Sequence, residues 1–492
     1  MNTNPLVCVT VTAPTVAELR QARDAAADAD LVELRLDTVR DPSVAAALAG
    51  RRRPVIVTCR SRAEGGQFQG SEEERRRILG DALALGAEYV DVEWRAGFDD
   101  LLTLAGGRRI VLSYHDFDGM PADLPGIARA MRSAGADIIK IAGKARRLSD
   151  CVSLMELGAS IGRQGNAVLI AMGEAGLVSR ILAGRFGSLW TYTGPFSGIG
   201  QLTPTALLDE YRFRHINANT RLYGLVGSPI SHSVSPAMHN AAFRAARIDA
   251  VYLPLPATDA EDFTRFAHAF GVKGASVTIP FKVPLYERVD EADSVARRIG
   301  AINTLRMDDG RWLGANTDAA GFLQPLGERA VLLRGIRAAI LGAGGSARAV
   351  AVALASSGAE VTVYARDRAK AEDVALLVGA AAGDWPPAPG SWDLAVNCTP
   401  VGMHPRVDSS PLPATALTGR WVYDLVYNPP LTQLLHDAEL AGCRTIGGLD
   451  MLVAQAHEQF HWWTNMRPAA GVMRSAALRR LSEFASNENH VV

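Results

Sequence analysis

Hydrophobic and polar residues alternate regularly along the first 200 or so residues. Short apolar runs, typical of strands buried on both faces, are separated by segments with helical spacing of apolar residues, such as 15–28, 72–85 and 124–133. This α/β pattern predicts a closed barrel of eight parallel strands, with an open doubly wound sheet as the alternative. The barrel is favoured because no glycine-rich phosphate turn follows the first strand. The expected strands are 7–11, 31–36, 55–59, 89–93, 110–114, 138–141, 168–171 and 189–192.

Charged residues gather at the carboxyl ends of these predicted strands, where such a barrel holds its chemistry. Lys140 lies within the sixth strand and His115 follows the fifth, so the two belong to adjacent strands. A desolvated lysine amine can form a Schiff base with a ketone, and a neighbouring histidine can take and return a proton. We expect Glu93 to orient or polarise His115, and Arg180 to bind a substrate carboxylate. Each residue alone could be structural, but their shared position favours elimination from a carbonyl substrate.

A new pattern begins near residue 219, without a long flexible linker. An apolar run at 338–341 leads into a glycine-rich turn, followed by a helical pattern and a second apolar run at 361–364. This order is typical of a Rossmann unit, in which the helix N-terminus binds a dinucleotide pyrophosphate, although an ordinary αβ turn is the alternative. The expected cofactor contacts are Gly342, Gly344, Gly345, Ser346 and Ala347.

The residues after the second strand of this unit indicate which dinucleotide binds. An acidic residue there would bind a ribose 2′-hydroxyl, whereas an arginine would bind a 2′-phosphate. Arg366 occupies this position and Lys370 follows closely, which favours NADP. Asp367 would repel a phosphate, so NAD remains the alternative.

Two charged residues of the second half are candidates for proton transfer. Lys282 follows a predicted strand at 272–279, and Asp318 ends the segment Gly-Ala-Asn-Thr-Asp at 314–318. Reduction of a ketone needs a hydride from a nicotinamide and a proton for the oxygen, and a Lys–Asp pair can relay that proton. An interdomain salt bridge is the alternative. A hydroxyl-rich loop at 228–235 could hold a carboxylate or polyol, or simply cap a helix.

The first half resembles the type I 3-dehydroquinate dehydratases over nearly all of residues 5–215. The resemblance rests on ELRLD (33–37), TCRSRAEGGQ (58–67), DVEW (91–94), HDF (115–117), GADIIKIA (135–142), MGEAGLVSR (172–180) and GPFSGIGQ (194–201). It implies a (β/α)8 barrel that dehydrates 3-dehydroquinate to 3-dehydroshikimate, with Lys140 as the Schiff-base lysine, His115 as acid and base, and Glu93 supporting the histidine. The residues implied to bind substrate are Glu33, Arg35, Arg60, Arg180, Ser197 and Gln201.

The second half resembles shikimate dehydrogenases over most of residues 222–485. The shared segments are GSPISHSVSPAMHN (227–240), SVTIPFK (276–282), GAINT (300–304), GANTD (314–318), GAGGSA (342–347), NCTPVGM (397–403), YDLVYNP (423–429) and GGLDMLVAQA (447–456). The resemblance implies NADP-dependent reduction of 3-dehydroshikimate to shikimate, with Lys282 and Asp318 as the catalytic pair. It departs at 365–367, where Ala-Arg-Asp replaces the usual Asn-Arg-Thr, and at Ser276, where many relatives have Asn. The residues implied to bind substrate are Ser233, Ser235, Thr278, Asn303, Tyr427 and Gln455.

Together these patterns predict a fused bifunctional enzyme that acts on small molecules. The barrel is expected at 1–219 and a two-lobed dehydrogenase at 220–492, with a substrate lobe at 222–325 and 450–485 and a Rossmann lobe at 330–445. A catabolic quinate/shikimate dehydrogenase that uses NAD is one alternative. A binding protein with decayed sites is another, which the presence of all four proposed catalytic lysine, histidine and aspartate residues disfavours.

Composition and charge exclude several other classes. The net charge of −1 disfavours a nucleic-acid partner, and no apolar run is long enough to cross a membrane. Five scattered cysteines and the absence of a targeting pattern indicate a reducing, cytoplasmic location. The segment His-Glu-Gln-Phe-His at 457–461 matches the zincin pattern, but no third ligand is evident, so we expect no metal site.

Overall fold

The computed structural model describes residues 4–162 and 165–488. It divides into two compact units, Met1–Arg221 with Asp249–Gly271, and Leu222–Ile248 with Val272–Val492. No single cut in the chain separates these units, because the segment 249–271 belongs to the first. The domain boundary near residue 219 therefore stays a prediction.

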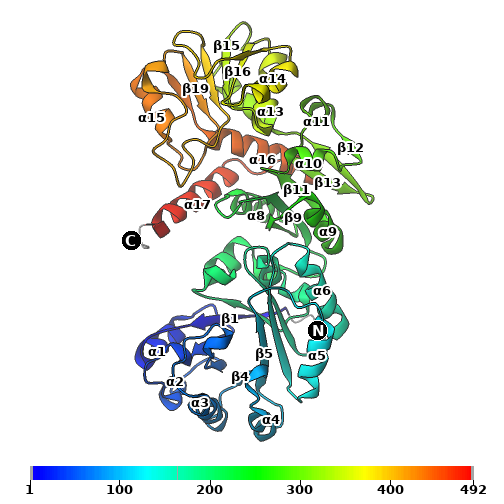
Figure 1. Cartoon of the computed structure of the whole chain (residues 1–492), viewed down its shortest axis with the longest axis vertical. Helices are drawn as coiled ribbons and strands as arrows, with labels where there is room; N and C mark the ends of the chain where they lie inside the picture. The colour runs from blue at the N-terminus through cyan, green and yellow to red at the C-terminus, as the bar shows by residue number, and fades with distance from the viewer. Residues whose placement is uncertain (1–3, 163–164, 489–492) are drawn as a thin grey trace. The chain divides into compact units, whose positions relative to one another are not determined.

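The first unit contains the predicted barrel of eight parallel strands, with helices around it (Figure 1). The strand order is β7-β6-β5-β4-β3-β2-β1-β8, and one bridge between Ala167 and Ser188 brings the two edges together, so the barrel is nearly closed. The strands are β1 (Leu6–Val11), β2 (Leu31–Arg35), β3 (Val55–Thr58), β4 (Tyr89–Glu93), β5 (Ile110–Asp116), β6 (Ile138–Lys144), β7 (Ala167–Met172) and β8 (Trp190–Thr193).

Local signals in the sequence start the helices between these strands. Thr15 accepts a hydrogen bond from the backbone of Glu18, and Ser71 and Glu74 form a reciprocal capping box. Inside the barrel, apolar side chains from opposite strands, including Ile56, Val111 and Trp190, fill a buried core. The helices are α1 (Val16–Ala25), α2 (Val44–Leu48), α3 (Glu72–Ala84), α4 (Asp99–Ala105), α5 (Leu124–Ser133), α6 (Asp150–Ile161) and α7 (Leu177–Ile181).

Residues 221–328 form a mixed six-stranded sheet with helices. Its order is β10-β9-β11-β13-β14-β12; β11 is parallel to β9 and antiparallel to β13. The strands are β9 (Arg221–Gly227), β10 (Ala250–Pro256), β11 (Val272–Val277), β12 (Glu291–Ala292), β13 (Thr304–Asp308) and β14 (Arg311–Ala315). The helices are α8 (Ser235–Ala245), α9 (Ala260–Phe270), α10 (Lys282–Tyr286), α11 (Ser294–Ile299) and α12 (Asp318–Glu328).

A second six-stranded sheet, all of whose pairs are parallel, has the order β17-β16-β15-β18-β19-β20. This order is that of a Rossmann fold and confirms the prediction from the glycine-rich turn. Its strands are β15 (Arg337–Leu341), β16 (Glu360–Tyr364), β17 (Ala381–Gly383), β18 (Leu394–Asn397), β19 (Trp421–Asp424) and β20 (Arg444–Ile446). The helices of this part are α13 (Gly345–Ser356), α14 (Arg368–Leu376) and α15 (Gln433–Leu440). Two further helices, α16 (Gly448–Thr464) and α17 (Val472–Glu488), pack on α12 and α8 respectively.

Candidate active sites

A cavity of about 140 Å³ is lined by residues at the carboxyl ends of the barrel strands. The structure therefore brings together most of the residues that the sequence predicted for this end of the barrel. Those on its wall are Glu33, Arg35, Arg60, His115, Lys140, Arg180 and Gln201, joined by Glu64, Phe117, Tyr192 and Phe196.

Lys140 lies on β6, and its ammonium group is surrounded by opposite charge. Only 5% of the residue is exposed. Its Nζ donates a hydrogen bond to Asp91 Oδ2 at 3.0 Å and lies 3.9 Å from Glu33 Oε1. The same nitrogen lies over the ring of Tyr192, 4.5 Å from its centroid. A desolvated cation is thus held at the cavity wall by two carboxylates and an aromatic face.

Asp91, which sequence reasoning did not single out, links this lysine to a buried arginine. Arg60 Nη2 lies 2.8 Å from Asp91 Oδ2, and Ser113 Oγ donates to Asp91 Oδ1 at 2.6 Å. Burial alone would raise the pKa of Asp91, but Arg60 and Lys140 hold it well below its ordinary value. Asp91 therefore stays ionised beside Lys140. A charged residue in the middle of a buried strand is a signal that could have identified it from sequence.

The carboxylate that contacts His115 is Glu64, which corrects the prediction that Glu93 orients the histidine. His115 Nδ1 lies 2.8 Å from Glu64 Oε2. Glu93 instead accepts a hydrogen bond from the backbone of Ser61 at 2.8 Å and lies 3.1 Å from Arg75 Nη1. Two buried arginines, Arg60 and Arg75, both form ion pairs with Glu93.

Burial shifts the pKa values of both His115 and Glu64. Burial raises the pKa of Glu64 to about 7. Burial, followed by the positive charges of Arg60 and Lys140, lowers the pKa of His115 well below its ordinary value. His115 is therefore neutral near pH 7, which is the state that a general base requires.

Arg180 provides a cation on another part of the wall. The residue is 3% exposed; its Nη2 donates to the carbonyl oxygen of Ile199 at 2.9 Å, and its Nε has no hydrogen-bond partner in the described part of the chain. Burial lowers its pKa to about 10, so it remains charged at neutral pH. A buried guanidinium with a free donor is suited to bind a carboxylate of a ligand.

The remaining predicted barrel residues differ in their surroundings. Arg35 forms a two-fold hydrogen-bonded pair with Asp37, with both contacts at 2.8 Å, and Gln201 accepts a hydrogen bond from the backbone of Phe196 at 3.2 Å. Ser197 begins a short 3-10 turn after β8; it is exposed and does not line the cavity.

In the second unit the structure brings together the predicted pair Lys282 and Asp318. Lys282 begins α10 and Asp318 begins α12, and Lys282 Nζ donates to Asp318 Oδ2 at 2.5 Å. The other carboxylate oxygen of Asp318 accepts a hydrogen bond at 2.8 Å from Asn303 Nδ2, which also donates to Gln455 Oε1 at 3.3 Å. Two predicted substrate residues are therefore neighbours of the Lys–Asp pair.

A second layer behind Asn303 was missed by sequence reasoning. Gln459 Nε2 donates to the carbonyl oxygen of Asn303 at 3.1 Å, and its Oε1 accepts from Ser276 Oγ at 2.7 Å. Ser276 had been noted only as a departure from its relatives, and the spacing of four residues between Gln455 and Gln459 on α16 is the signal that places both on one helix face.

The other predicted substrate residues occupy loops of the same unit. Ser233 Oγ accepts a hydrogen bond from the backbone of Ser235 at 3.2 Å. Burial raises the pKa of Tyr427, and a hydrogen bond with Ser233 opposes this rise. Thr278 lies four residues before Lys282, and its backbone N–H donates to Val226 at the end of β9 at 2.9 Å. The hydroxyl groups of Ser233 and Tyr427 therefore meet between the loops that follow β9 and β19.

The glycine-rich turn between β15 and α13 has the features of a phosphate-binding site. Gly342 has a φ of +112°, which favours glycine. Gly344 caps α13, and a Cβ built on it would have nothing within 4 Å, so the turn is open to a ligand. A Cβ on Gly345 would lie 3.1 Å from Lys282 Cδ, and Lys282 Nζ lies 3.4 Å from Ser346 Oγ. The turn therefore adjoins the Lys–Asp pair, while Ala347 is fully buried beneath it.

Exposed cations follow β16: Arg366 lies in the loop and Lys370 in the first turn of α14. The negative charge of Asp367 is paired with Lys370. Its side chain caps α14 by accepting a hydrogen bond from Lys370 N at 3.4 Å, and its carboxylate lies 3.5 Å from Lys370 Nζ. The open turn and these exposed cations fit a dinucleotide with a 2′-phosphate.

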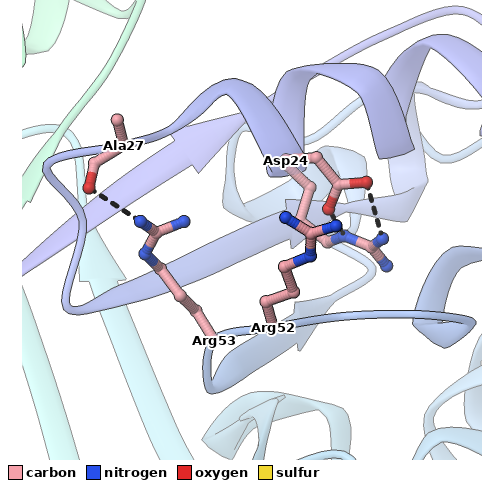
Figure 2. Close-up of a pocket in the computed structure, with 5 residues that line it drawn as sticks. Asp24, Ala27, Arg52 and Arg53 are labelled. Carbon is pink, nitrogen blue, oxygen red and sulfur yellow. Dashed lines mark hydrogen bonds and ion pairs between the residues drawn. The ribbon is translucent and has the colours of Figure 1, made fainter.

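A second cavity, of about 290 Å³, lies near the amino end of β3 and shares no lining residue with the first (Figure 2). Arg23, Asp24, Ala27, Arg52 and Arg53 line it, and Arg53 donates to the carbonyl oxygen of Ala27 at 2.8 Å. None of the residues predicted from the sequence lies on its wall.

The zincin-like segment lies on α16, where Glu458 forms an ion pair with Arg467. Within residues 4–162 and 165–488 no group of three or more His, Cys, Asp or Glu residues is arranged to hold a metal ion. Among the helices of these same residues, none combines the length and apolar character that crossing a membrane would require.

Three family models match successive parts of the chain. They are Type I 3-dehydroquinase at residues 7–218, Shikimate dehydrogenase substrate binding domain at 225–305 and Shikimate 5'-dehydrogenase C-terminal domain at 448–478.

Individual relatives agree with these matches. The bifunctional 3-dehydroquinate dehydratase/shikimate dehydrogenase of Arabidopsis thaliana, named as chloroplastic, is 33% identical over 94% of this chain and 83% of its own length. The shikimate dehydrogenase (NADP(+)) of Moorella thermoacetica is 43% identical over 52% of this chain and 92% of its own. A crystal structure of a shikimate dehydrogenase in complex with NADP+ covers 54% of this chain and 97% of its own, with 35% identity and a TM-score of 0.52.

Proposed function

We propose which site of this chain carries out each of two reactions, given that the chain belongs to the family of bifunctional 3-dehydroquinate dehydratases/shikimate dehydrogenases. It dehydrates 3-dehydroquinate to 3-dehydroshikimate and reduces that product to shikimate with NADPH. The first reaction belongs to the barrel and the second to the Rossmann half.

In the barrel, Lys140 attacks the ketone of 3-dehydroquinate. The lysine ammonium and the ketone together give an iminium and one water, so that a single positive charge stays on the nitrogen. His115 then removes a proton from the carbon next to the iminium carbon and returns a proton to the hydroxyl group that leaves as a second water. Hydrolysis of the new iminium consumes one water and releases the product. The observation that carries this assignment is the desolvated Lys140 on the wall of one cavity with His115.

Other barrel residues position these groups. Glu64 contacts Nδ1 of His115, which leaves Nε2 for proton transfer. The buried Arg180, with its free Nε–H, binds the substrate carboxylate. Glu33, Arg35, Arg60 and Gln201 complete the wall around the remaining substrate groups. Glu93 acts at a distance, by holding Arg60 and Arg75.

In the Rossmann half, Lys282 gives a proton to the ketone oxygen of 3-dehydroshikimate. Asp318 then passes a proton back to Lys282. NADPH supplies the hydride when it is bound. The turn from Gly342 to Ala347 holds its pyrophosphate, and Arg366 with Lys370 holds its 2′-phosphate. Asn303 fixes Asp318 through a hydrogen bond of 2.8 Å.

The substrate side of this site is assigned by position. Asn303 and Gln455 bind substrate hydroxyls beside the Lys–Asp pair, while the other residues hold the carboxylate side of the ring. Those residues are Ser233, Ser235, Thr278 and Tyr427. We place the protein in a reducing compartment such as the cytoplasm, since its five cysteines are free.

The test follows NADPH absorbance after 3-dehydroquinate alone is added to the purified chain. Consumption requires both reactions, because only the dehydrated product can be reduced. Lys140→Ala should abolish consumption from 3-dehydroquinate and keep it from 3-dehydroshikimate. If the unmodified chain consumes NADPH with neither substrate, the reductase assignment fails; if Lys140→Ala keeps both activities, the Schiff-base assignment fails.

A further inference from the structure

We propose that the ring of Tyr192 is a catalytic group of the barrel site, which stabilises the positive charge on Lys140 Nζ by a cation–π contact. The inference rests on the proposed function, in which this nitrogen forms a Schiff base. It adds a residue that neither the motifs nor the hydrogen bonds of the site identified.

The geometry of the contact is direct. Lys140 Nζ lies over the face of the Tyr192 ring, 4.5 Å from the centroid, within the distance of about 6 Å at which such contacts are significant. Tyr192 is 3% exposed and Lys140 is 5% exposed, so solvent does not screen the interaction. Both residues line the same cavity. The ring therefore forms the part of the cavity wall that lies against the nitrogen.

Neighbouring aromatic rings fix the orientation of Tyr192. Its ring meets that of Trp190 edge-on, with centroids 6.4 Å apart and an interplanar angle of 74°. Trp190 in turn lies against Tyr89, with centroids 5.5 Å apart. Burial, reinforced by the negative charge of Glu33, raises the pKa of Tyr192 well above its ordinary value. The residue is therefore a neutral phenol whose position the barrel core determines.

The chemistry explains why a ring is needed in addition to carboxylates. The ammonium of Lys140 has three N–H groups, but the iminium formed from it has only one. Lys140 Nζ donates a hydrogen bond to Asp91 at 3.0 Å and is an ion-pair partner of Glu33 at 3.9 Å, and the single N–H of the iminium can point to only one of these carboxylates. A cation–π contact needs no N–H, so the ring of Tyr192 continues to stabilise the charge after the carbon–nitrogen bond has formed.

The experiment weakens the ring electrostatically while leaving its volume nearly constant. Tyr192→Phe is the reference, and phenylalanines with increasing fluorine substitution are then introduced at this position. We expect the dehydratase kcat, and the fraction of chain trapped as a reduced adduct by borohydride with 3-dehydroquinate, to fall stepwise with fluorination. The fall across the series should reach roughly tenfold. Values that stay constant across the series would overturn the cation–π role.

Two controls separate this result from loss of structure. The same fluorinated residues at Phe186, which is fully buried in the barrel and does not line the cavity, should leave the dehydratase kcat unchanged. Reduction of 3-dehydroshikimate by the same protein samples should also be unchanged. If the unmodified chain forms no borohydride adduct, the proposed Schiff base fails; an adduct that is insensitive to fluorination contradicts only the role of Tyr192.

Discussion

The two lysines proposed for catalysis lie in very different electrostatic surroundings. Lys140 faces two carboxylates and an aromatic ring within a buried charge cluster that also contains Arg60. Lys282 faces one carboxylate, Asp318, whose other contact comes from an amide of Asn303. In the proposed mechanism, the first arrangement stabilises a positive charge on nitrogen while the substrate is covalently bound. The second would let the lysine give up a proton and receive one from its single carboxylate partner.

The largest expected effect is the loss of one activity, without loss of the other, when one of the two lysines is substituted. Lys282→Ala removes the proton donor, so reduction of 3-dehydroshikimate should fall by about 10²- to 10⁴-fold. Dehydration of 3-dehydroquinate, followed by the absorbance of the conjugated product, should not change. Lys140→Ala is the matched control with the opposite pattern. Parallel loss of both activities in either variant would contradict the separation of the sites.

The next prediction compares the carboxylates. Asp91→Asn leaves the buried Arg60 and Lys140 without this charge, and we expect it to lower the free energy of unfolding by about 3–5 kcal/mol and the dehydratase kcat by roughly 100-fold. Asp318→Asn should abolish most reductase activity but cost less stability, since the side chain of Lys282 is 12% exposed against 6% for Lys140. Denaturant titration of both variants measures the difference. Equal stability losses would show that burial does not separate the two pairs.

A smaller effect is expected at the cofactor loop. Arg366→Ala removes a cation expected to contact the 2′-phosphate, so the KM for NADPH should rise about tenfold while that for NADH stays nearly constant. Arg368→Ala is the control, because Arg368 is already paired with Glu372 and Asp384. Equal effects of the two substitutions would place the 2′-phosphate elsewhere.

A prediction of a different kind concerns the pH dependence of stability. The pKa of Glu64 is raised from 4.5 to about 7, so the folded chain holds this proton more tightly than the unfolded chain. The free energy of unfolding should therefore fall as the pH rises from about 4.5 to about 7, by roughly 3 kcal/mol at most. Glu64→Gln should flatten this slope in denaturant titrations at several pH values.

Glu88 should change the free energy of unfolding with pH in the opposite direction to Glu64. Burial alone would raise the pKa of Glu88, but hydrogen bonds from Arg51 and from the backbone of Val55 lower it. Its contribution is therefore lost as the pH falls, and Glu88→Gln should remove stability at neutral pH. A slope that Glu64→Gln leaves unchanged would show that another group is responsible.

The spacing of apolar residues along the sequence was sufficient to predict the barrel and the Rossmann sheet, because buried parallel strands form distinct apolar runs. The strand ends were less accurate: β5 continues to Asp116 and β6 to Lys144, so His115 lies inside β5 rather than after it. The reason is that His115 pairs in register with Ala142 of β6, and such pairing depends on a neighbour distant in sequence.

The barrel site was predicted less completely than the fold. Lys140 and His115 could be identified because lysine and histidine are uncommon in buried strands. The sequence pointed to Glu93 and did not suggest Glu64, because Glu64 ends a short 3-10 turn after β3 whose path hydrophobic patterning does not specify. Asp91 was overlooked although it lies within a buried strand, and its role follows only from the distances to Lys140 and Arg60.

The closeness of Gly345 to the side chain of Lys282 has a consequence for redesigning coenzyme preference. A Cβ at residue 345 would require the alkyl chain of Lys282 to shift by a few tenths of an ångström, so mutational libraries that vary the glycine-rich turn would also disturb this lysine. The loop after β16 and the first turn of α14 carry no such penalty, because Arg366 and Lys370 are exposed. An engineer who wishes to exchange one nicotinamide coenzyme for the other should randomise that segment and leave the glycine-rich turn as it is.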